Sequence, residues 1–329
     1  MTDDPLKHVL DALSGGKEEW VSSSSLTSKL DVSRMAVFKH VQRLRALGYA
    51  IEASPRLGYR MTARTDRPIE QEVVPRLHTQ VVGSEYQYVD SIASTNNFLR
   101  RHHENFLDGA TLVADRQTAG RGRLHRQWHS PAGTNLYFSV LLRPAVTPAL
   151  APQLSLVVAS AVLASVHEEG CADAVVKWPN DILWQGRKLV GILCELEAET
   201  DAIHAVVLGV GMNVNMTRFP GAIRDTAGSL RQAVGHAVSR PVLLARILNR
   251  LDAAYAQWLR EGLEPAAEFL NSHSALAGRD VYVERPTDTV QGCVDRITGE
   301  GHLRLRTPDG RVAEVASGEV QLCRPTEHA

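Results

Sequence analysis

The sequence predicts an α+β protein with three folded parts. Residues 1–64 combine helical periodicity with a hairpin pattern, residues 83–273 alternate between strand-like and helix-like runs, and residues 274–329 hold only short strand-like runs. Alternation of strands and helices within one segment is typical of a mixed sheet covered by helices. Residues 65–82, which contain two prolines, are predicted to be a linker or a short connecting helix.

The composition is that of a soluble globular protein. The 329 residues are 44% hydrophobic and 22% charged with a net charge of −1, so nucleic-acid binding would need a local basic patch. The N-terminal residues lack the basic and apolar regions of a secretory signal, and the apolar run Leu154–Val166 is short enough to be a buried helix. The four cysteines have no metal-binding or redox spacing. We therefore expect a cytoplasmic protein with no membrane partner.

The first part is predicted to contain three helices followed by a β-hairpin. Serines before the helices and glycine or aspartate after them mark the helix boundaries. Ser25 is expected to cap the second helix and Ser33 the third, and Asp31 between them tolerates a left-handed conformation. The expected helices are Lys7–Leu13, Leu26–Leu30 and Ser33–Leu47, and the expected hairpin strands are Ile51–Ala53 and Tyr59–Met61.

The third helix and the hairpin carry a concentrated positive charge. From Ser33 to Arg64 there are seven Lys or Arg and one acid, Glu52, which gives a local charge of +6. A basic helix followed by a β-hairpin wing is the pattern of a winged helix-turn-helix that binds duplex DNA. The alternative is a protein-interaction domain with a solvated basic face. The candidate DNA-contacting residues are Ser33, Arg34, Met35, Phe38, Lys39, Gln42 and Arg56.

The central and C-terminal parts differ in the lengths of their elements. In the central part, apolar β-rich runs alternate with longer helical runs, whereas in the C-terminal part short strands are separated by turns such as Asp309–Gly310. The expected central elements are strands at Tyr86–Val89, Ala110–Ala114, Leu136–Leu142, 174–196 and Ala205–Leu208, with helices from Ser94 and over 153–167, 241–260 and 263–272. The expected C-terminal strands are Val281–Glu284, Thr289–Ile297, His302–Arg306, Val312–Val315 and Val320–Arg324.

The loop Gln117–Trp128 has the composition of an anion-binding loop. It contains two glycines, whose backbone N–H groups can approach a ligand, and three arginines, whose fixed donors suit carboxylate and phosphate oxygens. Its final tryptophan offers a flat face to an aromatic base. The loop therefore predicts a site for an anion with an aromatic group attached. The alternative is a flexible, solvated basic loop, and no nucleotide-binding glycine motif is complete here.

A second motif, Lys177-Trp178-Pro179-Asn180-Asp181, ends a strand-like run. Two further strands joined by a Gln185–Gly186 turn follow it, and the second begins Arg187-Lys188. This arrangement places Lys177, Asp181 and Lys188 around one pocket.

Together these motifs resemble the biotin–protein ligase family. The resemblance rests on Gly-Arg-Gly-Arg at 120–123 followed by Trp128, on Lys177–Asp181, and on the run Arg-Lys-x-x-Gly-Ile-Leu at 187–193. With the N-terminal part, the chain resembles the bifunctional members that also repress the biotin operon. The resemblance covers nearly the whole chain and implies a biotin/lipoate-ligase fold for 83–273 and a small SH3-like β-barrel for 274–329. In many members a glycine occupies position 125, where this chain has His125, so we expect a stiffer loop.

The resemblance implies a two-step reaction. The biotin carboxylate attacks the α-phosphorus of ATP, in the presence of Mg²⁺, and forms biotinyl-5′-AMP; a lysine of the acceptor protein then attacks the activated carbonyl. The implied catalytic residues are Arg121, Arg123, Lys188 and Asp181, of which Asp181 either binds Mg²⁺ or steers the acceptor lysine. The implied biotin-binding residues are Ser94, Thr95, Asn96, Gln117, Arg121, Gly122, Arg123 and Lys188. The implied nucleotide-binding residues are Trp128, Asn213, Lys177, Gly209 and Gly211.

The resemblance also implies three partners. These are the biotin-carrier protein of acetyl-CoA carboxylase, operator DNA, and a second copy of the chain when biotinyl-5′-AMP is bound. The expected dimer surface is a sheet edge around Tyr137–Arg143 and Ile192–Leu196. The alternatives are a regulator that senses the adenylate without efficient ligation, and a lipoate-type acyl ligase. The first is disfavoured because the lysines and arginines needed for the chemistry are present, and the second because the motif at 177–181 is typical of biotin ligases.

Overall fold

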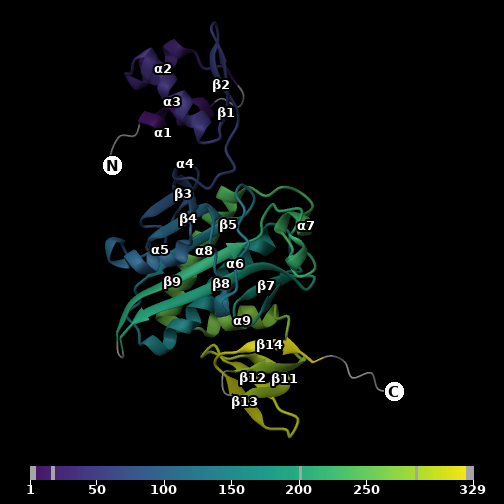
Figure 1. The fold of residues 1–329 in the computed structure, drawn as a ribbon. Coiled ribbons are helices and arrows are strands. Elements are labelled where there is room, and N and C mark those ends of the chain that lie inside the picture. The colour runs from purple at the N-terminus through teal and green to yellow at the C-terminus, as the bar shows by residue number, and fades with distance from the viewer. Residues whose placement is uncertain (1–4, 16–18, 200–201, 286–287, 324–329) are drawn as a thin grey trace. The chain divides into compact units, whose positions relative to one another are not determined.

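The chain divides into two compact units. The computed structural model describes residues 5–15, 19–199, 202–285 and 288–323, and its units are Met1–Pro75 and Arg76–Ala329. Figure 1 shows the elements of both units with the labels used below.

The first unit has the predicted three helices and hairpin. Val37, Val41 and Leu44, which repeat at helical spacing on the third helix, are buried in its core as expected. Asp31 has a left-handed φ of 50° in the turn before that helix, and Ser33 caps it by accepting a hydrogen bond from the N–H of Ala36 at 3.1 Å. The elements are α1 (Pro5–Ser14), α2 (Ser23–Leu30), α3 (Arg34–Ala46), β1 (Ala50–Ser54), β2 (Gly58–Ala63) and α4 (Glu70–Val73).

The predicted cap of the second helix is wrong. Helix α2 begins at Ser23, so Ser25 lies inside its first turn. The capping residue is Ser22, whose hydroxyl accepts from the N–H of Ser25 at 3.1 Å. The run of four serines offers several equivalent candidates, and a cap is decided by which residue takes the extended conformation.

Part of the predicted linker packs against the first unit. Glu72 of α4 is 1% exposed, and its carboxylate accepts from the Tyr49 hydroxyl at 2.7 Å and from Arg64 at 3.0 Å. A buried carboxylate requires such partners. Residues up to Pro75 therefore fold with the first unit.

The second unit is built on a seven-stranded mixed sheet. Its strand order is β3-β4-β5-β9-β8-β7-β6; β3 and β4 are parallel, and the other neighbouring strands are antiparallel. The tight turn between β7 and β8 is at Gln185–Gly186, as predicted, and both of its residues have positive φ. The strands are β3 (Tyr86–Ile92), β4 (Thr111–Gln117), β5 (Leu136–Leu142), β6 (Val175–Lys177), β7 (Asp181–Trp184), β8 (Arg187–Ala198) and β9 (Ile203–Met212).

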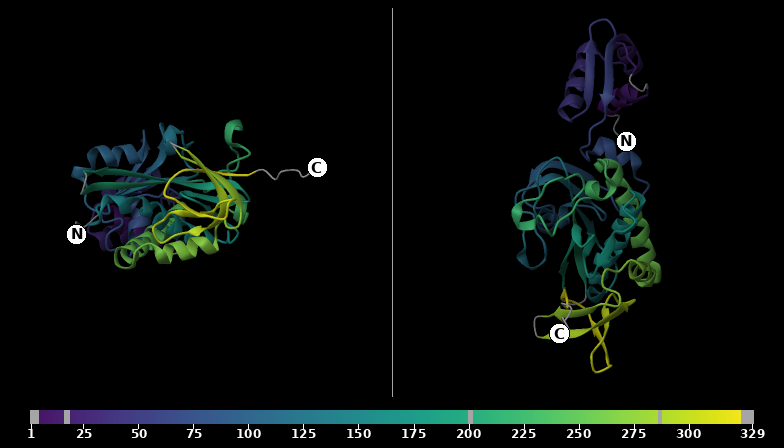
Figure 2. Two further views of the ribbon diagram at one scale, coloured as in Figure 1. Left: turned by 90° about the horizontal axis from the view of Figure 1, so that it is seen from below. Right: turned by 90° about the vertical axis from the view of Figure 1, so that its right-hand side faces the viewer.

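Helices cover the sheet on both faces. Strand residues alternate between the faces, so Val206, Leu208 and Val210 lie on the face next to α6, while Gly209 and Gly211 lie on the face next to α5. In the left view of Figure 2 the green helices α8 and α9 run along one face of the sheet. The helices are α5 (Thr95–His102), α6 (Leu154–Glu168), α7 (Leu230–Val234), α8 (Arg240–Glu261) and α9 (Glu264–Ser272). Short 3₁₀ turns occur at Val74–Arg76, His103–Asn105, Arg123–His125, Pro148–Gln153 and Gly221–Ile223.

Helix α6 forms part of the core of the second unit, as its apolar run predicts. Within the described residues, the segment Pro148–Glu168 is long and apolar enough to cross a membrane by composition alone. However, 72% of its most apolar window is buried inside the protein. This burial is what a core helix shows.

The C-terminal strands form a separate five-stranded antiparallel sheet in the order β13-β12-β11-β10-β14. The predicted Asp309–Gly310 turn joins β12 to β13, with Gly310 at a φ of 83°. Arg324, predicted to end the last strand, lies outside the described residues. The strands are β10 (Asp280–Glu284), β11 (Thr289–Ile297), β12 (Leu303–Arg306), β13 (Val312–Val315) and β14 (Glu319–Leu322).

Half of the predicted dimer edge is wrong. Strand β5, which holds Tyr137–Leu142, lies between β4 and β9 and is buried throughout, so it forms no edge. The edge strands of this sheet are β3 and β6. Strand β8 pairs with β7 only as far as Gly191, so the Ile192–Leu196 segment has β9 as its one paired strand among those described.

Candidate functional site

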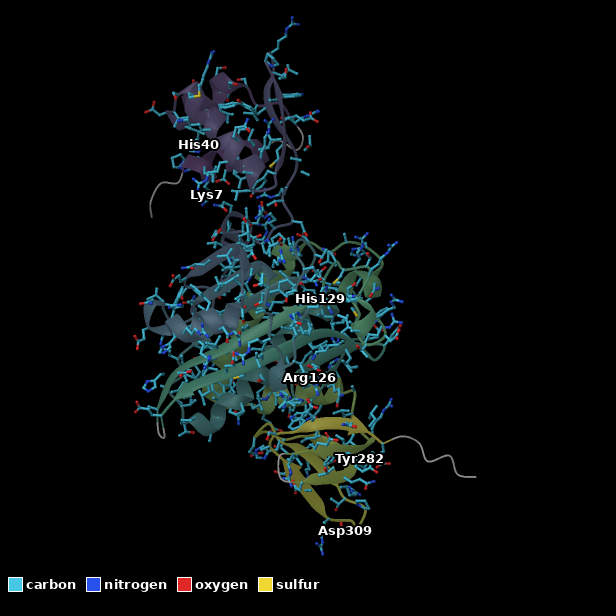
Figure 3. The ribbon with its side chains drawn as sticks, in the orientation of Figure 1. Lys7, His40, Arg126, His129, Tyr282 and Asp309 are labelled. Atoms are coloured by element: carbon cyan, nitrogen blue, oxygen red, sulfur yellow. The ribbon has the colours of Figure 1, made fainter. Side chains whose placement is uncertain are left out.

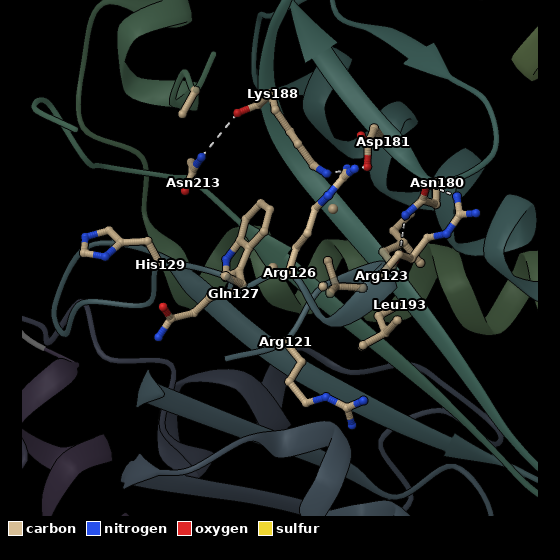
Figure 4. A pocket seen from close by; sticks show the side chains of 18 of the residues that line it. Arg121, Arg123, Arg126, Gln127, His129, Asn180, Asp181, Lys188, Leu193 and Asn213 are labelled. Atoms are coloured by element: carbon tan, nitrogen blue, oxygen red, sulfur yellow. Dashed lines mark hydrogen bonds and ion pairs between the residues drawn. The ribbon is translucent and has the colours of Figure 1, made fainter. Parts of the chain in front are cut away.

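The second unit contains a cavity of about 570 Å³ next to the loop 117–130. This volume is typical of small-molecule sites. The loop, the β7–β8 hairpin, strand β9 and the start of α5 all contribute to it (Figure 4). The cavity brings together every residue predicted to bind biotin, nucleotide or Mg²⁺ or to act in catalysis: Ser94, Thr95, Asn96, Gln117, Arg121, Gly122, Arg123, Trp128, Lys177, Asp181, Lys188, Gly209, Gly211 and Asn213.

Two glycines form a floor for Trp128. Gly191 of β8 and Gly211 of β9 are direct cross-strand partners. A Cβ atom would lie 2.9 Å from the indole at Gly191 and 2.5 Å from it at Gly211. Real side chains essentially never approach this closely, so only glycine lets the indole lie against the sheet. The indole Nε1 is buried without a hydrogen-bond partner among the described residues.

A polar cluster surrounds the start of α5. Ser94 caps the helix by accepting from the N–H of Asn97 at 3.4 Å, and Gln117 accepts from the N–H of Thr95 at 2.9 Å. The buried Ser139 hydroxyl lies 2.7 Å from the Thr95 hydroxyl and 2.6 Å from Oδ1 of Asn96. These contacts fix a row of donors and acceptors at one end of the cavity.

The same cluster connects to the arginine loop through Glu195. This carboxylate accepts from Nδ2 of Asn96 at 3.0 Å and pairs with Arg121 at 3.1 Å. Arg121 also donates to Oδ1 of Asn97 at 2.5 Å. Arg121 is therefore held toward α5, away from Lys188 (Figure 4).

The other loop arginines contact different elements. Arg123 donates to Oδ1 of Asn180 at 2.9 Å and to the carbonyl of Gly318 at 3.2 Å. Arg126 forms an ion pair with Glu319 of β14 at 2.7 Å, on the side of the central sheet next to the C-terminal sheet (Figure 3). Between them, Leu124 has a left-handed φ of 52°. The loop thus joins the cavity to the C-terminal sheet.

Lys188 lines the cavity between Asp181 and Trp128. Its ammonium group is 2.6 Å from Asp181 and 5.5 Å from the centre of the Trp128 ring (Figure 4). Its backbone is fixed on both sides, because its N–H donates to Thr226 at 2.7 Å and its carbonyl accepts from Gly228 at 3.1 Å. A lysine held by a single carboxylate is placed to exchange that partner for a substrate anion.

The cavity carries an excess of positive charge. Its lining cations are Arg121, Arg123, Arg126, Lys177 and Lys188, and its lining acids are Asp181 and Glu319. Such a site favours anionic ligands. Among the described residues, no group of three His, Cys, Asp or Glu side chains is arranged to hold a metal ion.

Sequence reasoning missed several residues that shape this site. Ser139 lies within an otherwise apolar strand, and Glu195 follows no motif. The available signal is the period of two along β8, which places Gly191, Leu193 and Glu195 on the same face. Gly191 belongs to the Arg-Lys-x-x-Gly-Ile-Leu run, but the run by itself does not indicate that this glycine contacts Trp128.

The first unit presents the predicted basic face. All seven candidate DNA-contacting residues of α3 and the wing are exposed, including two apolar side chains, Met35 at 63% and Phe38 at 46%. Arg60 is engaged within the unit, since it pairs with Glu52 at 2.6 Å and lies over the Trp20 ring.

Models of two known families match the two units of the chain. The biotin/lipoate A/B protein ligase family model matches residues 88–213, and an HTH domain model matches residues 6–60. The chain is 35% identical to the bifunctional ligase/repressor BirA of Bacillus subtilis (strain 168) over 319 residues, covering 96% of this chain and 98% of the relative. The chain belongs to the bifunctional ligase/repressor family.

The chain is also similar to a second member of this family and to a solved structure of a biotin protein ligase. BirA of Escherichia coli (strain K12) is 34% identical over 97% of each chain. The solved structure of the biotin protein ligase from Aquifex aeolicus in complex with biotin and ATP has a TM-score of 0.64 and 30% identity, and covers 73% of this chain and 99% of that one. The part of this chain matched by the ligase family model contains all the predicted ligand residues from Ser94 to Asn213.

Proposed function

We propose that this protein attaches biotin to a lysine of a biotin-carrier protein, using ATP, and that it represses biotin-synthesis genes. The observation that carries the ligase activity is the single cavity that joins the α5 polar cluster, the arginine loop, Lys188 and Trp128. The family supports it, because the chain matches ligase/repressors over almost its whole length. The carrier protein of acetyl-CoA carboxylase is the proposed acceptor.

In the proposed binding mode, biotin lies at the α5 end and the nucleotide lies at Trp128. The ureido ring of biotin has donors and acceptors that suit the polar groups of Ser94, Thr95, Asn96 and Gln117. The adenine stacks on the indole of Trp128 and contacts Asn213, with Gly209, Gly211 and Lys177 around it. The unpaired indole N–H supports this assignment, because a buried donor needs an acceptor that a ligand can supply.

The chemistry requires two anions to be brought together. A carboxylate oxygen of biotin attacks the α-phosphorus of ATP, pyrophosphate leaves, and biotinyl-5′-AMP forms. Arg121, Arg123 and Lys188 offset the repulsion and the charge that develops on the phosphate oxygens. The acceptor lysine then attacks the carbonyl carbon, and AMP leaves.

Mg²⁺ fits this site as an ion that enters with ATP. Such ions usually take one or two carboxylates together with phosphate oxygens and water. Asp181 is the lining carboxylate nearest the lysine and would hold the ion once Lys188 turns to the phosphate. When bound, Mg²⁺ would neutralise phosphate charge.

Repression is assigned to the first unit. We propose that α3 and the wing bind operator DNA through Ser33, Arg34, Met35, Phe38, Lys39, Gln42 and Arg56. Two copies would read two related half-sites, with the adenylate-bound chains pairing through the Ile192–Leu196 segment of β8. A cytoplasmic location, an SH3-like barrel at 274–329, and domain limits of 1–64, 65–82, 83–273 and 274–329 belong to the same proposal, with the part of 65–82 up to Pro75 packed on the first domain.

A pyrophosphate-release assay tests the ligase. Release is expected with biotin and ATP and not with lipoate and ATP, followed by labelling of a purified carrier domain. Pyrophosphate release with lipoate and ATP but not with biotin and ATP would identify a lipoate-type acyl ligase. Operator binding without pyrophosphate release would identify a regulator that senses the adenylate without efficient ligation. Either outcome would contradict the proposed activity.

A further inference from the structure

Asn135 lies just before β5, does not line the cavity, and contacts Asn213, which does. The Asn135 side chain is 0% exposed. Its Oδ1 accepts from the backbone N–H of Val214 at 3.0 Å, and its Nδ2 donates to Oδ1 of Asn213 at 3.3 Å and lies 3.5 Å from the sulfur of Met216. Asn213 in turn donates through Nδ2 to the carbonyl of Lys188 at 3.2 Å. Two side-chain amides are therefore joined in series between two backbone groups.

These backbone groups determine which way both amides point. An amide side chain accepts through its oxygen and donates through its nitrogen. The N–H of Val214 can only donate, so it takes the oxygen of Asn135 and leaves the Asn135 nitrogen facing Asn213. The carbonyl of Lys188 can only accept, so it takes the nitrogen of Asn213. Reversing either amide would place two donors or two acceptors against each other.

The Asn135 backbone is itself held firmly. The buried Arg240 donates to the Asn135 carbonyl at 3.1 Å and pairs with Asp115 at 2.8 Å. The neighbouring Thr134 carbonyl accepts from the N–H of Asn215 at 2.8 Å. The Asn135 backbone is thus held by α8 and by the segment that follows β9, so Asn135 cannot adapt easily to a reversed neighbour.

Asn213 presents a fixed pattern to the cavity. After its two internal hydrogen bonds, it retains one N–H donor and one acceptor lone pair. The adenine edge offers an amino donor beside a ring-nitrogen acceptor, and asparagine binds this edge through two hydrogen bonds in other systems. In a 6-oxopurine such as hypoxanthine, a carbonyl acceptor replaces the amino donor and would face the oxygen of Asn213. On the N1 side the ring nitrogen also changes from acceptor to donor, whereas N7 remains an acceptor.

We propose that Asn135 is a specificity-determining positioning residue. It holds Asn213 in the orientation that accepts a 6-aminopurine nucleotide and rejects a 6-oxopurine nucleotide. This inference rests on one part of the proposed function, namely that the purine of the nucleotide lies between Trp128 and Asn213. It adds a base-selecting role for a residue outside the cavity.

The first test uses the unmodified protein. Calorimetry would measure the binding of AMP, IMP and purine riboside monophosphate, which lacks the amino group but keeps the ring acceptor. IMP is expected to bind at least about tenfold more weakly than AMP, because its 6-oxo group would face the buried oxygen of Asn213. Purine riboside monophosphate is expected to bind with an affinity between those of AMP and IMP. AMP and IMP affinities within about twofold of each other would overturn the proposal.

This binding test is separable from ligation. If the protein forms no adenylate from biotin and ATP, the proposed function fails, but base selectivity can still be measured by binding. If it ligates and yet does not distinguish AMP from IMP, the role of Asn135 fails and the ligase function stands.

The second test changes Asn135 itself. In Asn135→Asp one oxygen still accepts from Val214, but the other faces the Asn213 oxygen and favours the reversed amide. The AMP-to-IMP affinity ratio is expected to fall about tenfold, with biotin affinity within about twofold of the unmodified protein. A purely structural role would weaken both nucleotides equally and leave the ratio unchanged.

Asn135→Ser and a control complete the series. Asn135→Ser removes the orienting amide without adding charge, so it tests the proposal even if the aspartate variant does not fold; the ratio should fall toward one. Asn271→Ser is the matched control, since Asn271 bonds both backbone groups of Ile297 far from the cavity. It should lower stability without changing the ratio. An unchanged ratio in an Asn135 variant with normal biotin affinity would overturn the proposal.

Discussion

Replacing Gly191 by alanine tests whether the glycine floor positions Trp128. Gly191 is not in the left-handed region, so an alanine backbone is unstrained there and the effect comes from the added methyl group. That methyl would lie 2.9 Å from Cζ3 of Trp128 and 3.0 Å from Cε of Lys188. Carbon atoms in good contact are about 3.5–4.0 Å apart, so both side chains must move away by roughly half an ångström or more.

The expected cost follows from this displacement. A gap of about 0.5–1 Å loses a quarter to a half of a van der Waals contact, and stacking of a base on an aromatic side chain contributes about 1–3 kcal/mol. Gly191→Ala should therefore weaken nucleotide binding about twofold to tenfold. Biotin binding should weaken less, because the polar cluster around Asn96 lies at the other end of the cavity.

Calorimetry with AMP and with biotin, each added alone, measures both effects. Gly221→Ala is the matched control, since a Cβ there meets nothing within 4 Å and the residue does not line the cavity. It should bind both ligands as the unmodified protein does. If Gly191→Ala also binds AMP normally, or loses biotin affinity to the same extent, the floor does not position the indole and the reasoning is refuted.

Four further outcomes are expected. Lys188→Ala should slow pyrophosphate release about 10²–10³-fold with little change in thermal unfolding, and normal turnover would contradict its role. Glu195→Gln loses the ion pair with Arg121 and should raise the KM for biotin several-fold without changing the KM for ATP; an equal rise in both would contradict this. Lys39→Ala should reduce the slope of log operator affinity against log salt by about 0.9 without affecting ligation, and an unchanged slope would rule out a phosphate contact. Burial raises the pKa of the Cys194 thiol to about 12, so iodoacetamide at about pH 8 should leave Cys194 unmodified in the native protein and modify it after denaturation; rapid native modification would contradict this.

Motifs within a short stretch of sequence predicted most of the cavity. The 117–128 loop and the 177–193 hairpin each hold their charged groups at fixed local spacing, so chain connectivity alone groups Arg121 with Arg123 on the loop and brings Asp181 near Lys188 on the hairpin. Local periodicity was also enough for α3 and the C-terminal strands, whose hydrophobic patterns are regular.

Contacts that depend on strand order could not be predicted in this way. Asn135 reaches Asn213 because β5 pairs with β9 rather than with another strand, and Ser139 reaches Asn96 because α5 packs on β5. No local pattern encodes which strands become neighbours. The predicted sheet edge at Tyr137–Arg143 is wrong for the same reason, because the strand order that places β5 between β4 and β9 is not encoded in any local pattern.

The left-handed Leu124 affects how tightly the loop can close. An L-residue with a side chain costs about 1–2 kcal/mol in this conformation, whereas glycine adopts it freely. This conformation of the loop is therefore expected to be populated roughly tenfold less than it would be with glycine, and a ligand that requires it must offset this difference. The apparent affinity for biotinyl-5′-AMP is then expected to be lower, and the intermediate is expected to leave sooner toward an acceptor. Leu124→Gly should accordingly slow adenylate dissociation in a stopped-flow chase, and an unchanged rate would show that loop opening does not govern release.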